Sequence, residues 1–130
     1  MSLIDLHTHS TASDGSLSPG ELVDMAAKKG LAALALTDHD TLDGLPEARA
    51  AGQVRNIDVI AGVELSVADG ERSVHLLGLF LPERPGPLAE ALAYLRERRH
   101  NRNRLILDKL RTLGVPLEYK AVTALAKGAV

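Results

Sequence analysis

The stretch "LAALALTDHD" (residues 31–40) decides the fold, because six apolar residues end abruptly in four polar ones. A short, uninterrupted run of small apolar side chains is typical of a strand covered on both faces, as in a parallel sheet packed under helices. In such sheets, functional side chains gather at the carboxyl ends of the strands. The stretch therefore predicts a buried parallel strand that carries His39 to a functional edge.

The flanking segments alternate between helix and strand. Upstream, "SLSPGELVDMAAKKG" (16–30) predicts a helix over about residues 19–29, with Ser18 as N-cap, Glu21 closing a capping box and Gly30 as the stop. "LIDLHTH" before it is strand-like. Downstream, "LDGLPEARAAG" (42–52) predicts a shorter helix and "IDVIAGVELSV" (57–67) a further strand. This order indicates right-handed βαβ units and an α/β fold.

A hairpin follows the third strand. Asp69-Gly70 lies between two apolar-rich runs, which is a strong signal for a two-residue turn. If these two residues are the centre of the turn, Ala68 pairs with Glu71 and Glu64 lies directly opposite His75. Directly opposed residues share a face of the sheet, with Cβ atoms about 4.5–5.5 Å apart. We therefore expect the hairpin to bring a carboxylate and an imidazole together.

The composition changes after the hairpin. Residues 82–114 have apolar residues at helical spacing and predict a long helix, and residues 115–130 predict one more short helix. His100 belongs to the long helix and is not expected to be a ligand. The middle of that helix carries five arginines, which either contact nucleic-acid phosphates or form a solvated helix face. These are Arg96, Arg98, Arg99, Arg102 and Arg104.

Composition excludes several classes of function. The chain of 130 residues has no cysteine, so disulfides and zinc–thiolate sites are excluded and any metal site must be built from His, Asp and Glu. With 2% aromatic residues, a general base-stacking surface for single strands is not expected. There is no apolar run of membrane-spanning length and no signal-peptide pattern, so we expect a cytoplasmic protein without a membrane partner.

Two histidines in the first strand raise the question of a metal site. In an extended chain, His7 and His9 point to the same side, and their Cα atoms are about 6.6–6.8 Å apart, which lets both rings reach one ion. The alternative is a pair of polar residues on a solvated strand face. Four further residues of ligand type fall at predicted strand ends or in the hairpin, and these are Asp14, His39, Glu64 and His75.

Each of these residues alone has an ordinary structural explanation. Asp14 precedes Gly15 and fits a turn, His39 fits a polar loop, Glu64 fits a strand-edge charge, and His75 fits a core histidine bonded to a carbonyl. Their joint placement at one edge favours a site organised by cations, because uncompensated charges crowded together are costly to desolvate.

The motifs "DLHTHSTASDG" (5–15), "LTDHD" (36–40), "GVELS" (62–66) and "VHLLG" (74–78) resemble those of the PHP family, the polymerase and histidinol phosphatase superfamily. The resemblance covers about residues 1–81. It implies the N-terminal part of a distorted, seven-stranded β/α barrel (residues 1–86), followed by a helical insert (residues 87–130). Within the family, "SDG" (13–15), "TDHDT" (37–41) and a helical segment after the hairpin resemble the branch that acts on nucleoside 3',5'-bisphosphates and on the 5' ends of short RNA.

The resemblance also implies a metal site and its chemistry. Two or three divalent ions (Mn, Fe or Zn) are expected, with Glu64 bridging two of them and with Glu64 and His39 as the catalytic residues. Asp5 and Asp38 are expected to orient imidazoles from behind the site. The implied metal ligands are His7, His9, Asp14, His39, Glu64 and His75.

The resemblance is incomplete, which leaves three hypotheses for function. Further ligands of the family, a later His and an Asp-x-His motif, have no counterpart in these 130 residues, and a closed barrel usually takes more than about 200 residues. We therefore expect an N-terminal part of a longer protein, with open edges that favour self-association. The favoured function is a phosphoesterase acting on nucleotides or short RNA. The alternatives are a phosphatase of a small metabolite such as histidinol phosphate, and a non-catalytic metal-binding or interaction fragment.

Overall fold

The computed structural model describes residues 3–70, 72–82 and 86–126, which form four strands and four helices. In chain order these are β1 (Leu3–Thr8), α1 (Pro19–Lys28), β2 (Leu31–Leu36), α2 (Leu45–Arg55), β3 (Asp58–Asp69), β4 (Arg72–Leu79), α3 (Pro87–Thr112) and α4 (Tyr119–Ala126). Among the described residues, no helix is long and apolar enough to cross a membrane.

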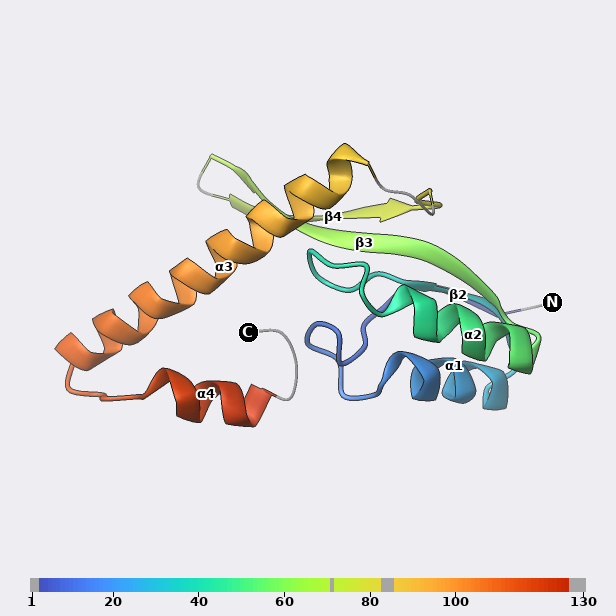
Figure 1. Cartoon of the computed structure of the whole chain (residues 1–130), viewed down its shortest axis with the longest axis horizontal. Helices are drawn as coiled ribbons and strands as arrows, with labels where there is room; N and C mark the ends of the chain where they lie inside the picture. The colour runs from blue at the N-terminus through green and yellow to red at the C-terminus, as the bar shows by residue number, and fades with distance from the viewer. Residues whose placement is uncertain (1–2, 71, 83–85, 127–130) are drawn as a thin grey trace.

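The strands form one mixed sheet in the order β1-β2-β3-β4. The first three strands are parallel and β4 is antiparallel to β3, so the predicted βαβ order and the hairpin are both present. Helices α1 and α2 lie side by side against one face of this sheet (Figure 1). The mixed α/β class with a half-barrel sheet is confirmed, whereas the closed barrel and the role of α3 and α4 as an insert remain predictions.

The core lies between the two helices and the sheet. Leu34 and Leu36 of β2 are almost fully buried against Val23 of α1 and Ala48 of α2. The predicted capping box is present, because the Ser18 hydroxyl accepts from the Glu21 N–H while the Glu21 carboxylate accepts from the Ser18 N–H. The second helix begins three residues later than predicted, because residues 42–44 form a turn in which the Leu45 N–H bonds to the Leu42 carbonyl.

The register of the hairpin differs from the prediction. Asp69 pairs with Arg72, so Glu64 lies opposite Leu77, and His75 lies opposite Ser66. The predicted partner of Ala68, residue 71, lies outside the described residues. Gly70 has φ +61°, a left-handed backbone conformation that glycine adopts without strain. The expected direct pairing of Glu64 with His75 is therefore wrong. The register differs from the expected one by two residues, and a shift of two residues keeps both side chains on the same face of the sheet.

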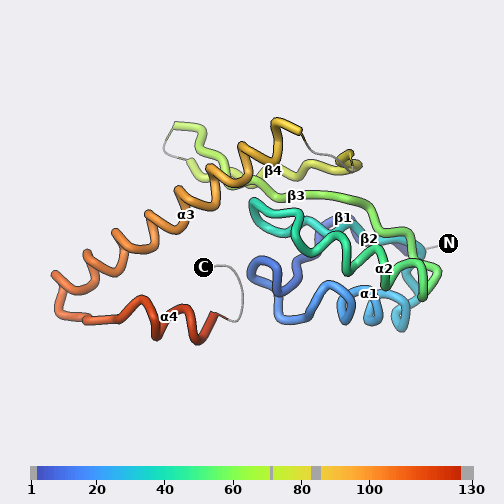
Figure 2. The backbone as a smooth tube through the Cα atoms, in the orientation of Figure 1, coloured from blue at the N-terminus to red at the C-terminus, as the bar shows by residue number. Residues whose placement is uncertain are grey.

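Helices α3 and α4 form a helical pair that extends beyond the sheet (Figure 2). Tyr119 at the start of α4 packs edge-on against His100 of α3, and the Tyr119 hydroxyl lies 2.7 Å from His100 Nδ1. His100 therefore connects the two helices. An apolar cleft of about 310 Å³ between the helices is lined by Ile106, Leu110 and Val122.

The outer edge of β1 predicts self-association of this chain when it is produced alone. Strand β1 pairs only with β2 among the described strands, and its Leu3 and Ile4 side chains are 62% and 59% exposed. Unpaired backbone and apolar side chains at an edge favour pairing with another chain. Light scattering of the 130-residue chain is expected to show oligomers that Ile4→Lys reduces. Val54→Lys, at an exposed position on α2, is the control and leaves the oligomers unchanged.

Candidate metal centre

The carboxyl ends of the parallel strands bring the predicted ligands together. His7 lies one residue before the end of β1 and His9 directly follows the strand, while His39 follows β2 in a loop that forms an isolated parallel bridge with Glu64 of β3. The imidazole rings of His7 and His9 have centroids 5.1 Å apart, and those of His9 and His39 are 4.8 Å apart. The same-face placement inferred from the spacing of the His-x-His pair is thus present in the folded chain.

Glu64 lies at the centre of this group and is 2% exposed. Its Oε2 atom is 2.8 Å from His7 Nε2 and 2.9 Å from His9 Nε2. Its Oε1 atom instead contacts His75 Nδ1, which comes from the antiparallel strand β4. The two carboxylate oxygens therefore face different imidazoles, an arrangement that suits a carboxylate shared between two cations.

Asp14 approaches from the loop after β1 and faces the same histidines. Its Oδ1 is 3.3 Å from His9 Nδ1 and its Oδ2 is 3.6 Å from His39 Nε2. The ligand atoms of the six predicted residues form three overlapping groups, in each of which all atoms lie within 4.8 Å of one another. The groups are His7–His9–Glu64, His9–Asp14–His39 and His39–Glu64–His75.

This donor set fits divalent cations on chemical grounds. Each group offers imidazole nitrogens together with a carboxylate, and imidazole and carboxylate are ligands that Zn, Mn and Fe accept. Three residues, His9, His39 and Glu64, each belong to two of the three groups, so neighbouring cation positions would share ligands. The arrangement is therefore suited to a cluster of ions rather than to one isolated ion.

Electrostatics favour the ligand forms of His39 and Glu64. Burial lowers the pKa of His39, against the opposing effects of Glu64 and Asp14, so its imidazole is neutral at neutral pH. The Nδ1 atom of His39 is buried without a hydrogen-bond partner among the described residues, which also disfavours a protonated ring. For Glu64, burial opposes ionisation, but the hydrogen bonds from His7 and His75 contribute to a net lowering of its pKa.

Asp38 binds the loop that follows β1. Its Oδ1 accepts from the Ser10 N–H at 2.7 Å and from the Ser13 hydroxyl at 2.6 Å, while its Oδ2 accepts from the Ser10 hydroxyl at 2.7 Å. All three of these groups are buried. Asp38 therefore fixes the loop that presents Asp14, and reaches the His9 ring only through Ser13, whose hydroxyl lies 3.5 Å from His9 Nδ1. Asp5 likewise accepts from the backbone N–H of His7 at 3.2 Å and not from a ring.

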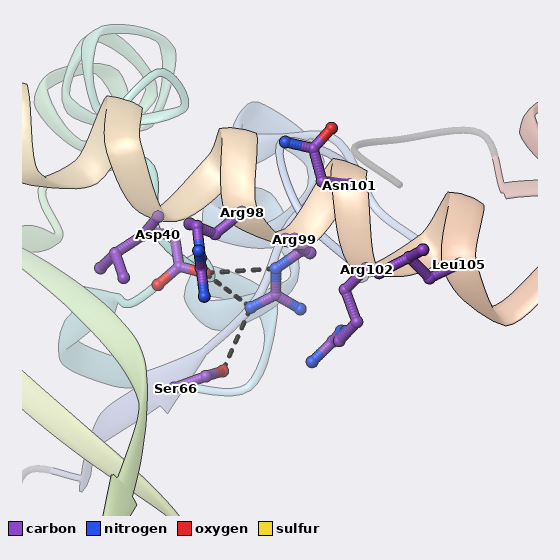
Figure 3. A pocket seen from close by; sticks show the side chains of 8 residues that line it. Asp40, Ser66, Arg98, Arg99, Asn101, Arg102 and Leu105 are labelled. Atoms are coloured by element: carbon purple, nitrogen blue, oxygen red, sulfur yellow. Dashed lines mark hydrogen bonds and ion pairs between the residues drawn. The ribbon is translucent and has the colours of Figure 1, made fainter.

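A salt bridge beside the site was not predicted from the sequence. Arg99 of α3 donates to Asp40 Oδ2 at 2.6 Å and to the Ser66 hydroxyl at 3.1 Å (Figure 3). Arg96 donates to the Asp40 carbonyl at 2.9 Å. Asp40 is 3% exposed and has φ 54°, a left-handed conformation that Asp tolerates better than most residues. The only signal in the sequence was the spacing of two arginines one helical turn apart.

The loop geometry gives a testable role to Gly15. A Cβ atom at this position would lie 2.3 Å from the His9 carbonyl oxygen, closer than any side chain is normally tolerated. We expect Gly15→Ala to move the loop that carries Asp14, to destabilise the protein by about 1–3 kcal/mol, and to weaken divalent-metal binding. Calorimetric metal titration and chemical unfolding measure both effects.

Ser16→Ala is the matched control, because Ser16 is the exposed neighbour of Gly15. It should change neither the free energy of unfolding nor metal affinity. Unchanged metal affinity in Gly15→Ala would show that the loop does not present Asp14 to a cation.

Comparisons of the sequence with protein-family models and with known proteins all indicate the same family. The model of the PHP domain matches residues 5–126 of the chain. The 3',5'-nucleoside bisphosphate phosphatase of Chromobacterium violaceum is 42% identical over 130 residues, which are 100% of this chain and 43% of the relative. The 5'-3' exoribonuclease of Haemophilus influenzae is 43% identical over 126 residues, or 97% of this chain and 46% of the relative.

A solved structure supports the same grouping. A protein of Bifidobacterium adolescentis, described as a candidate metal-dependent phosphoesterase, matches with a TM-score of 0.86 and 28% identity over 98% of this chain and 46% of that one. The chain thus spans less than half the length of each of these relatives. On the evidence of its motifs, its fold and these matches, the chain belongs to the PHP domain family.

Proposed function

We propose that the chain carries part of the active site of a metal-dependent phosphoesterase that hydrolyses phosphate esters of nucleotides or short RNA. The observation that carries the proposal is Glu64, a buried carboxylate whose two oxygens face imidazoles from different strands. The printed names of the phosphatase and exoribonuclease relatives support the substrate class.

Six residues of this chain would hold the ions, with Glu64 as the bridging ligand. They are His7, His9, Asp14, His39, Glu64 and His75. Bound divalent ions lower the pKa of a coordinated water toward about 7 and neutralise charge on phosphoryl oxygens. We propose two or three ions per complete site, with Mn, Fe or Zn as candidates, because the donors are imidazole and carboxylate.

The residues of this chain contribute positioning and electrostatics. Glu64 would supply the negative charge that holds divalent cations, and the lowered pKa of His39 keeps its ring in the neutral form needed for binding a cation. We assign the catalytic roles to these two residues for that reason. Asp38 and the serines it binds keep Asp14 at the edge of the site.

The division of the chain follows from the same proposal. Residues 1–86 would form the first part of a barrel that bears the metal ligands, and residues 87–130 would begin an inserted helical segment. Two contacts support an insert that serves the site, since Arg96 and Arg99 of α3 reach the loop immediately after His39.

The complete protein is expected to release phosphate from adenosine 3',5'-bisphosphate in the presence of Mn²⁺. Glu64→Gln, which keeps the size of the side chain but removes its charge, should lower kcat/KM more than about 100-fold, because even outer partners of metal ligands are worth 10–100-fold. Malachite green detection of phosphate measures the rate, and metal analysis by mass spectrometry measures the loss of bound ions.

Asp24→Asn is the control, because Asp24 pairs with Arg55 on the exposed surfaces of α1 and α2. It should leave activity intact. Histidinol phosphate, assayed in parallel, tests the alternative of a small-metabolite phosphatase. Full activity in excess chelator would rule out the metal mechanism.

A further inference from the structure

The ring of His39 makes its polar and ring contacts, within the described part of the chain, with other predicted ligands. Its Nε2 atom lies 3.6 Å from Asp14 Oδ2 and 3.8 Å from Glu64 Oε2. Its ring packs against those of His9 and His75, and its Nδ1 atom is buried without a hydrogen-bond partner among the described residues. A metal-binding histidine usually donates from its second nitrogen to a carboxylate or carbonyl that fixes the ring. The position of His39 therefore depends mainly on its backbone.

The backbone on both sides of His39 is bonded to Glu64. The Asp38 carbonyl accepts from the Glu64 N–H at 3.3 Å, and the Asp40 N–H donates to the Glu64 carbonyl at 3.0 Å. Asp40 has φ 54°, a left-handed conformation that costs free energy in a residue other than glycine and persists where its surroundings enforce it. The pairing that places His39 beside Glu64 thus depends on the groups that hold Asp40.

Two arginines of α3 hold Asp40. Arg99 donates to the Asp40 Oδ2 atom from Nε at 3.2 Å and from Nη2 at 2.6 Å, while Arg96 donates to the Asp40 carbonyl at 2.9 Å. Arg99 Nη2 also donates to the Ser66 hydroxyl, which joins the loop after β2 to β3 (Figure 3). Asp40 is 3% exposed and its Oδ1 atom has no hydrogen-bond partner among the described residues. Within that part of the chain, its carboxylate forms an ion pair only with Arg99.

Loss of the Arg99 guanidinium would leave the Asp40 carboxylate buried without a counter-ion. Such a group is costly to keep out of water, so the Asp40 side chain is expected to turn toward solvent. Because Asp40 directly follows His39, this movement would shift the His39 backbone. The unpartnered Nδ1 atom gives the ring no second point of attachment that could resist the shift.

We propose that Arg99 is a positioning residue of the metal centre, which holds His39 in place through the buried carboxylate of Asp40. Arg99 would then set the affinity for the cations that His39 binds, without touching them. This inference rests on the proposed function for the presence of divalent ions, and it gives α3 a part in building the metal centre. One of the three candidate groups lacks His39 and should be affected least, and it is His7–His9–Glu64.

Calorimetric titration of the complete, metal-free protein with Mn²⁺ tests this role. Arg99→Gln is expected to weaken one class of bound ions about 10–100-fold, as is usual for residues that orient metal ligands. A class that does not need His39 should keep its affinity within about twofold, and mass spectrometry counts the ions retained. Arg111→Gln is the matched control, because it removes the same charge from an exposed position in the last turn of α3, and it should change neither class.

A second variant keeps the charge of Arg99. Arg99→Lys can still pair with Asp40, but it lacks the planar fork that reaches Asp40 and Ser66 together. It should fold if Arg99→Gln does not, and should weaken the same class of ions to a smaller extent. Unchanged Mn²⁺ affinity in every folded Arg99 variant would overturn the positioning role.

A double-mutant cycle separates positioning from a general loss of stability. His39→Ala removes the proposed ligand itself, and in that background Arg99→Gln should weaken Mn²⁺ binding no further, because its effect passes through His39. Losses that add in the double variant would show that Arg99 acts on the whole fold, and would contradict the inference.

None of these measurements requires turnover, so the inference and the proposed function can fail separately. A wild-type protein that binds Mn²⁺ but hydrolyses no phosphate ester contradicts only the proposed function. Nuclear magnetic resonance of the His39 ring in the metal-free protein gives a readout that needs no ion. Shifted ring resonances in Arg99→Gln, but not in Arg111→Gln, support the positioning of His39 by Arg99, and unchanged resonances in both variants contradict it.

Discussion

One buried carboxylate sets the arrangement of the residues around it. Glu64 is almost inaccessible, and an ionised group removed from water is costly unless positive or hydrogen-bonding groups surround it. The surrounding groups come from three other segments, His7 and His9 at the end of β1, His39 after β2, and His75 on β4. The parallel order of the strands and the hairpin are both needed to bring these segments to the same carboxylate.

The helices, the strands and the residues that meet around Glu64 could be predicted from the sequence, because short-range patterns and the common edge of parallel strands determine them. The apolar run of β2 and the capping box of α1 are short-range patterns, and the common edge follows from parallel strands. The hairpin register depends instead on which residue takes the positive φ. Asp69 pairs with Arg72, and Gly70 has the positive φ. The cross-strand partner of Glu64 is therefore Leu77 instead of His75, but the Glu64 side chain stays on the expected face of the sheet.

The roles of Asp38 and Asp40 could not be predicted, because their partners are distant in sequence. Asp38 binds Ser10 and Ser13, which lie in the loop after β1. Asp40 binds Arg99, which lies fifty-nine residues further along the chain. The "LTDHD" motif alone does not indicate that Asp38 binds the serines of the loop after β1 and that Asp40 binds α3. That choice depends on how α3 packs, and a periodic arginine pattern does not specify this.

Asp40, with its left-handed backbone, connects α3 to His39. Asp40 is joined to His39 by a peptide bond, and its carboxylate and carbonyl are both held by arginines of α3. If docking of α3 helps to hold His39 in place, a ligand that favours the docked helix also increases the affinity of a site that needs His39. Thermodynamic linkage makes this effect reciprocal. Occupancy of a site that needs His39 in place would in turn increase the affinity for a ligand that favours the docked helix.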